Sequence, residues 1–417
     1  MDYILFFVYL GLFCWLIPRI QFISSAGIDQ KIIIALFSIR VIAGVINGYM
    51  NLYFYSGTDT AYFQLAGLTE YNLLFNDPKE YFVNIFKDSH GYAGLLDTKD
   101  SFWNNLRTNL IIKLLSIFNI FSRGNFFINT LFYNFLIFFG SISFYKVFNQ
   151  LLPGKKGLLI ITLFLLPSVT YFSSAIHREG LIFLGLGILC NNLFDIINKQ
   201  KYSYSKFLWI GLGILLIVLI RNFVFITLIP AVTGWIIAEK NKRFALLSFI
   251  IIYLLFISVF FSSGWVHPKL NLPQYVSDRQ IAFVEIAKQG KSAININPLF
   301  PNFRSFLNNA PQALNHALMR PYITEKFTLL YIFVEVEIFV YQLLFLLFLF
   351  FRVKAKATDP FLFFCTFFGI SMFLMIGYTI PIIGALIRYR SIYFPLLLIP
   401  IVCYTDWKII KNLLHFK

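Results

Sequence analysis

The sequence predicts an all-α, polytopic transmembrane bundle with about eleven spans. Of the 417 residues, 59% are hydrophobic and only 13% are charged, whereas soluble domains carry about a quarter charged residues. Apolar runs near the roughly 20 residues that cross a bilayer recur along the whole chain. Lys and Arg gather in short clusters between these runs, as in cytoplasmic loops. The net charge of +16 therefore indicates membrane topology, and nucleic acid is not expected as a partner.

The expected spans are the apolar runs, and together they make 1–417 a single polytopic membrane domain. The runs cover 3–20, 31–48, 126–148, 157–173, 179–196, 207–221, 222–238, 245–263, 327–351, 360–379 and 389–405. Basic clusters such as Lys240, Lys242 and Arg243 are placed on the cytoplasmic side. An odd number of spans then puts the N-terminus outside and the C-terminus in the cytoplasm. The first run lacks a positive n-region, so we expect it to be an uncleaved span.

Two long segments face outward in this topology, and their lengths point to function because long loops are otherwise uncommon. Outer loop 1 covers 49–125, and outer loop 2 covers 264–326. Within the first, 106–121 is too short and too charged for a clear span. We expect an interfacial helix there, with a re-entrant segment as the alternative.

The first candidate functional residue is Asp59, just beyond the second run and between Thr58 and Thr60. Its carboxylate can act as a general base toward a hydroxyl, or help to hold a divalent cation. The structural alternative is a helix N-cap, because Asp is common at that position.

The second candidate is the short connection PSVTYFSSAIHREG at 167–180. Ser173 or Ser174 is expected to cap the next helix, which places His177, Arg178 and Glu179 in its first turn. A helix N-terminus and an arginine together favour an anion such as phosphate. His177 can shuttle protons. Glu179 is either a second carboxylate or the ion-pair partner of Arg178 in a purely structural, salt-bridged turn.

Four arginines lie at the outer ends of spans, although the positive-inside rule places most Lys and Arg on the cytoplasmic side. Because the planar guanidinium suits phosphate or pyrophosphate, we interpret them as anion ligands, with snorkelling to lipid headgroups as the alternative. They are Arg221, Arg320, Arg388 and Arg390. Arg388 and Arg390 diverge on a regular helix, so we expect only one of them to face a shared site.

Two acids interrupt the apolar stretch IFVEVEIFV and are two residues apart, so they cannot face the same cavity. They are Glu335 and Glu337. We expect at least one of them to pair with an arginine, and Glu335 is assigned a supporting role. The four cysteines form no CxxC pair, and neither a disulfide nor a metal site is expected. Walker, HExxH and GxSxG motifs are missing as well.

Four stretches in this order resemble the O-antigen-polymerase-like (Wzy-type) proteins of bacterial surface-polysaccharide assembly. They are SGTDTAYF, LPSVTYFSSAIHREG, HALMRPY followed by Glu335, and IGALIRYRSIYFP. The acid early in outer loop 1 also resembles that of GT-C glycosyltransferases, which use lipid-linked donors. That resemblance implies a GT-C-like fold and makes Asp59 the catalytic acid or base and Glu179 a looser second match. The paired acids of GT-C enzymes are absent here, so no cofactor is required by this reading and a divalent cation is left open.

The resemblance implies a polyprenyl-(pyro)phosphate donor, held by the arginines, and a polymerase that joins lipid-linked repeat units in the bacterial cytoplasmic membrane. The implied partners are the polyprenyl-linked glycan and membrane lipids, with a flippase and a chain-length regulator left open. Two alternatives remain at this point. One is a GT-C-type enzyme that adds a single sugar from a polyprenyl-phosphate donor, and the other is a flippase for lipid-linked glycan.

Overall fold

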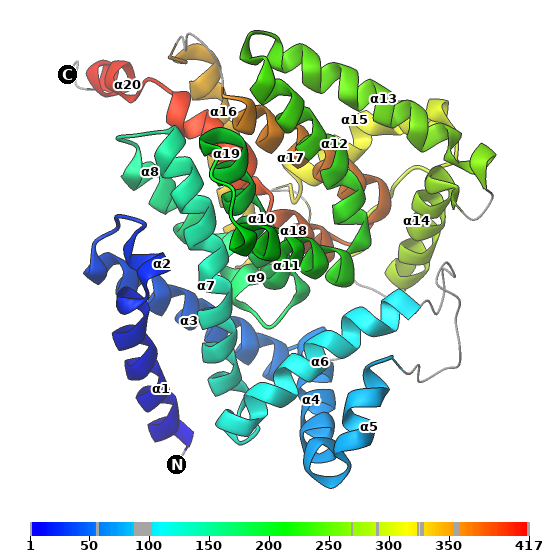
Figure 1. The fold of residues 1–417 in the computed structure, drawn as a ribbon. Coiled ribbons are helices and arrows are strands. Elements are labelled where there is room, and N and C mark those ends of the chain that lie inside the picture. Colours follow the sequence, from blue (N-terminus) through cyan, green and yellow to red (C-terminus); the bar gives the residue numbers. More distant parts are fainter. Residues whose placement is uncertain are drawn as a thin grey trace. The chain divides into compact units, whose positions relative to one another are not determined.

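The computed structural model describes residues 2–55, 58–86, 102–267, 270–288, 292–322, 325, 329–353 and 359–414. Within these residues the regular structure is helical, apart from two isolated β-bridges that join Ala293 to Ile382 and Arg352 to Thr405. Figure 1 follows the chain from α1 in blue to α20 in red. The all-helical fold class is thus confirmed, whereas the GT-C-like arrangement stays a prediction.

The chain divides into two compact units, and each is described by itself. Unit 1 holds Met1–Gln150 and Leu163–Phe225, and unit 2 holds Leu151–Thr162 and Ile226–Lys417. The longer helices of unit 1 are α1 (Asp2–Leu16), α3 (Gln30–Tyr53), α4 (Asp59–Asn76), α5 (Pro78–Val83), α6 (Phe102–Ser122), α7 (Phe126–Leu151), α9 (Pro167–Ser174), α10 (Arg178–Lys199) and α11 (Tyr204–Ile220). The short α2 (Gln21–Ser24) and the 3₁₀ turns η1 (Ile17–Arg19) and η2 (Asn84–Phe86) complete it.

Unit 2 contains the remaining helices. They are α8 (Lys156–Ile160), α12 (Asn222–Lys240), α13 (Ala245–Val266), α14 (Leu272–Lys288), α15 (Phe303–Met319), α16 (Leu329–Phe350), α17 (Pro360–Thr379), α18 (Ile383–Ser391), α19 (Phe394–Tyr404) and α20 (Trp407–Leu414). Between α14 and α17 lies a buried cluster of Val276, Leu299, Phe306, Ala313 and Tyr378. The buried hydroxyl of Tyr378 in this cluster has a hydrogen-bond partner, because Tyr378 Oη donates to the carbonyl of Phe306 at 2.8 Å.

All eleven apolar runs fall on helices, but the structure supports a smaller number of spans. Among the described residues, eight helices are long and apolar enough to cross a membrane. Two bent helix pairs, at 156–174 and 383–404, raise the number to ten if each pair is one span. The remaining run is α11, an apolar helix of 17 residues that is shorter than these candidates. The chain therefore has the helices of a polytopic membrane protein, and the count of eleven stays a prediction.

Both long segments between the spans are largely helical in the residues that the structure describes. The segment 49–125 contains α4, α5 and α6, and the segment 264–326 contains α14 and α15. Helix α6 covers the expected interfacial helix at 106–121 and is not among the candidate spans. The charge in the middle of this apolar segment is Lys113, whose side chain is buried against neighbouring helices.

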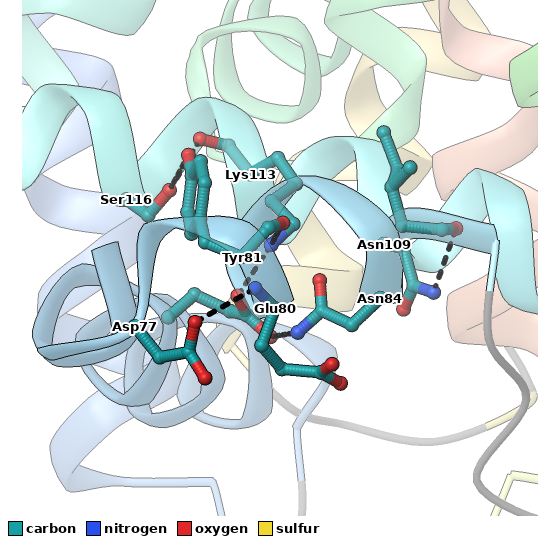
Figure 2. A network of polar contacts seen from close by, with 9 residues as sticks. Asp77, Glu80, Tyr81, Asn84, Asn109, Lys113 and Ser116 are labelled. Atoms are coloured by element: carbon teal, nitrogen blue, oxygen red, sulfur yellow. Dashed lines mark hydrogen bonds and ion pairs between the residues drawn. The ribbon is translucent and has the colours of Figure 1, made fainter.

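Figure 2 shows the polar network around Lys113 that holds α4, α5 and α6 together. Lys113 Nζ lies 2.5 Å from Glu70 Oε2 on α4, donates to the carbonyl of Tyr81 on α5, and lies 3.6 Å from the centre of the Tyr81 ring. Asn84 Nδ2 donates to the other oxygen of Glu70 at 2.8 Å, and the hydroxyls of Tyr81 and Ser116 lie 2.7 Å apart. The network makes α4, α5 and α6 one preformed module.

We expect Lys113→Met to loosen this module, because Glu70 and the Tyr81 carbonyl lose a buried donor that contributes about 1–3 kcal/mol. Amide hydrogen exchange of the purified chain should become faster in α4 and α6. Lys79→Met is the matched control, since Lys79 is an exposed lysine of α5 and should leave exchange unchanged. Equal exchange rates in the two variants would contradict the role of Lys113.

Candidate functional site

The candidate site of unit 1 lies at the break between α9 and α10. Pro167 is the first residue of α9, which ends at Ser174, and α10 begins at Arg178 with His177 at its N-cap position. Arg178 and Glu179 therefore lie in the first turn, as predicted from the sequence. The expected cap by Ser173 or Ser174 is wrong, because both serines still belong to α9.

Glu179 forms a buried ion pair with Arg221. Arg221 Nη2 donates to Glu179 Oε1 at 2.6 Å, and the two side chains are only 5% and 1% exposed. Arg221 is the C-cap residue of α11, so this pair joins the end of α11 to the start of α10. Removing two charges from water is costly, and close pairing compensates much of the cost. Glu179 therefore serves to hold the guanidinium of Arg221 in place.

Arg178 joins the same turn to α4 and α6. Its Nη2 atom donates to Thr108 Oγ1 at 3.0 Å, and its guanidinium carbon lies 5.5 Å from the centre of the Phe63 ring. The side chain is half-buried. A planar guanidinium with five N–H donors can bind an anion while it keeps such a contact.

Asp59 is the first residue of α4 and is exposed. Thr58 caps this helix, since its Oγ1 accepts from the amide of Ala61 at 3.3 Å, so Asp59 is not the N-cap that the alternative interpretation proposed. Asp59 and Phe63 are four residues apart and lie on the same side of α4. The side of α4 that carries Asp59 is thus the side that contacts Arg178.

Two of the arginines in unit 2 have structural partners at the end of α15. Arg320, the C-cap residue of α15, lies 2.9 Å from Glu325 in an ion pair. Arg390 is buried and donates from Nη1 to the carbonyl of Ala317 at 2.7 Å. This carbonyl is in the last turn of α15, where a cation interacts favourably with the helix dipole. Arg388 is half-buried and contacts the hydroxyl of its neighbour Tyr389 at 3.3 Å.

Glu335 and Glu337 both lie on α16 and are both largely buried. Glu337 accepts a hydrogen bond from Tyr341, and its charge acts on Arg390. Glu335 has Glu325 as its charged neighbour. The acid that interacts with an arginine is therefore Glu337, whereas the sequence assigned the supporting role to Glu335.

The nine predicted site residues are thus divided between the units. Unit 1 contains Asp59, His177, Arg178, Glu179 and Arg221, and unit 2 contains Arg320, Glu335, Arg388 and Arg390. A single site made of all nine stays a prediction. The arrangement in unit 1 is the more specific of the two, because the N-cap and first turn of α10 hold His177, Arg178 and the buried Glu179 that pairs with Arg221.

Two buried residues of this region were missed in the sequence. Arg40 on α3 is fully buried and donates to Ser141 Oγ at 3.1 Å and to Ser173 Oγ at 3.0 Å. Its position inside an apolar run was a usable signal, since ionisable residues within spans are rare. Tyr133 on α7 is also fully buried and contacts the carbonyl of His177. No local pattern distinguishes it from the other aromatic residues of α7.

Unit 2 holds a buried histidine that no sequence motif singled out. His316 lies in the last turn of α15, three residues before the helix ends. Burial, helped by the nearby charge of Arg320, lowers the pKa of His316 to about 4. The imidazole is therefore neutral at pH 7 and takes up a proton only in strongly acidic solution.

Comparisons with known proteins give no relative for this chain. No family model, no curated protein and no solved structure matches it. Across the residues that the structure describes, no group of three or more His, Cys, Asp or Glu side chains is placed to hold a metal ion. The assignment of a function therefore depends on the geometry of the site in unit 1 and on the resemblance of its sequence motifs.

Proposed function

We propose that this chain is a polymerase of lipid-linked oligosaccharide repeat units in the bacterial cytoplasmic membrane. It would transfer the growing glycan from a polyprenyl-(pyro)phosphate donor to the hydroxyl of another lipid-linked unit. The observation that carries the proposal is the first turn of α10, where Arg178 lies beside the buried Glu179–Arg221 pair. Two guanidinium groups, fixed by their contacts near a helix N-terminus, suit a phosphate.

In the proposed reaction the acceptor oxygen attacks the anomeric carbon of the donor glycan. A new C–O bond forms, the bond from that carbon to the phosphate oxygen breaks, and the electron pair leaves with the lipid (pyro)phosphate. Asp59 takes the proton of the acceptor hydroxyl as general base. Arg178 and Arg221 stabilise the negative charge that develops on the departing phosphate, and His177 carries protons at the same turn. Arg320, Arg388 and Arg390 are proposed as further donor ligands, with Glu335 in support.

Two features support this proposal over transport. The predicted site residues of unit 1 lie at the ends of α4, α10 and α11, whereas a passage for lipid-linked glycan favours charges along the middle of its spans. Arg40, buried in the middle of α3, is the exception. The exposed carboxylate of Asp59 also lies one helical turn from Phe63, which Arg178 contacts, so a base is available on the same side of α4.

The first test is mass spectrometry of lipid-linked glycans from cells that lack the chain. Accumulation of one complete repeat unit is the expected result for a polymerase. A unit short by one sugar would replace the proposal with single addition by a GT-C-type enzyme. An unchanged glycan profile would contradict both enzymes and leave transport or an unrelated role.

We expect Asp59→Asn to reduce polymer formation by at least about 100-fold, because it removes the general base but keeps the size of the side chain. Polymer length is measured on gels of cells that carry only the variant. Asp77→Asn is the matched control, since Asp77 caps α5 through the amide of Glu80 and Asn caps equally well. Polymers of normal length with Asp59→Asn would exclude this residue as the base.

A further inference from the structure

The backbone changes direction between α9 and α10, and the first turn of α10 needs a hydrogen-bonding partner from outside the helix. The first amides of any helix lack partners within it. His177 occupies the N-cap position without a side-chain hydrogen bond to these amides, although side-chain oxygens commonly supply one there. Another group must therefore fix this turn.

Tyr133 on α7 makes such a contact at the carbonyl of the N-cap residue, and not at the first three amides of the helix. Its hydroxyl donates to the carbonyl of His177 and also contacts the amide of Leu181, the residue four positions later. These two backbone groups are the ones that the first hydrogen bond of α10 joins. The Tyr133 hydroxyl therefore lies directly at the first turn of the helix. Its side chain is fully buried, so no water competes for these contacts.

Gly180 permits this close approach. A Cβ atom at position 180 would lie 2.7 Å from Tyr133 Oη and 2.6 Å from the carbonyl oxygen of Ser173. Atoms at such distances clash, and Ile137 Cδ1 would be nearer still at 2.3 Å, so any larger residue would displace the phenol, α9 or Ile137 from the turn. The glycine and the tyrosine together define the geometry of the break.

We propose that Tyr133 is a positioning residue: by fixing the first turn of α10 it directs Arg178 toward Thr108 and Phe63 and Glu179 toward Arg221. This inference rests on the proposed function, because it assigns Tyr133 a role in the same site. Tyr133 touches no substrate in this scheme and acts only through the three residues of the turn. The contacts that depend on it are the 3.0 Å bond to Thr108 and the 2.6 Å ion pair.

The test uses Tyr133→Phe in the full-length chain, with Tyr145→Phe as the matched control. Tyr145 lies on the same helix and is equally buried, and its hydroxyl has no hydrogen-bond partner among the described residues. Hydrogen exchange of the segment 175–182 should become faster in Tyr133→Phe and stay unchanged in Tyr145→Phe. Unchanged exchange in Tyr133→Phe would overturn the inference, whatever the chain catalyses.

Activity is measured on the lipid-linked glycan that accumulates in cells lacking the chain. Tyr133→Phe should lower kcat about tenfold or more with a smaller change in KM, since a misplaced ligand loses mainly stabilisation of the transition state. Combined with Arg178→Ala, it should add little further loss, because both changes remove the same placement. A purely structural role would lower the amount of folded protein and leave kcat per folded molecule unchanged.

The possible failures are distinguishable. Faster exchange with an unchanged kcat, or losses that add fully with Arg178→Ala, would overturn the positioning role while the polymerase stands. If the wild-type chain does not extend the glycan at all, the proposed function fails. In that case the exchange experiment still decides whether Tyr133 fixes the turn.

Discussion

Arg221→Met is expected to leave Glu179 as a buried acid without its cationic partner and to reduce the free energy of unfolding by about 3–5 kcal/mol. The size of the effect follows from the burial of the pair, whose side chains are only 5% and 1% exposed. Little water can reach Glu179 to replace the lost guanidinium. The thermal stability of the detergent-solubilised chain measures the loss.

The matched control is Lys288→Met. Lys288 Nζ lies 2.6 Å from Glu285 Oε1, the same separation as in the buried pair. The side chains of Lys288 and Glu285 are, however, each more than 60% exposed. Exposed pairs contribute about 0–1 kcal/mol, so this variant should melt close to the wild type. If the two variants lose equal stability, the Glu179–Arg221 pair is not buried as described.

A double variant separates stability from function. Glu179→Leu combined with Arg221→Met removes both charges, and replacing a buried pair by apolar residues is often neutral or stabilising. We expect this chain to recover most of the stability and still to make no polymer, because the phosphate loses a ligand. Polymer formation by the stable double variant would exclude Arg221 from the proposed site.

The sequence predicted the membrane helices well because hydropathy depends on composition within a short window. Each apolar run corresponds to a helix, including the two bent pairs. The helices α4, α5, α14 and α15 were missed as helices for the same reason. They lie outside the apolar runs, and α15, for example, combines polar residues with a buried face that includes Phe306 and Ala313. Hydropathy alone does not reveal such amphipathic elements.

The sequence identified candidate residues of the site, but it did not identify which of them interact. His177, Arg178 and Glu179 could be selected because three ionisable residues occupy one short connection. The partner of Glu179 could not be read from the sequence, since Arg221 is 42 positions away and Arg178 is adjacent. Similarly, only the packing of α7 against α9 and α10 brings Tyr133 to the backbone of His177. Long-range contacts of this kind depend on the fold rather than on a local pattern.

Gly377→Ala is expected to disrupt the packing of α15 on α17 and to cost about 3 kcal/mol of stability, as overpacking of a close contact does. A Cβ atom at position 377 would lie 2.0 Å from the carbonyl oxygen of Ala313. Because the obstructing atom belongs to a helix backbone, no side-chain rotation can relieve the clash. The two helices must move apart, which also displaces the end of α15 where Ala317 accepts from Arg390.

The control for this prediction is Gly211→Ala. Gly211 lies inside α11, and no atom lies within 4 Å of the position that its Cβ would take. Alanine there should keep or raise stability, because glycine in a helix interior costs about 1 kcal/mol relative to alanine. In thermal melting of the two purified variants, Gly377→Ala should lower the melting temperature and Gly211→Ala should keep or raise it. If Gly377→Ala melts at the same temperature as the wild type or higher, α15 and α17 do not approach as closely as described. The packing of these helices would then not explain the position of the Ala317 carbonyl, which accepts from Arg390.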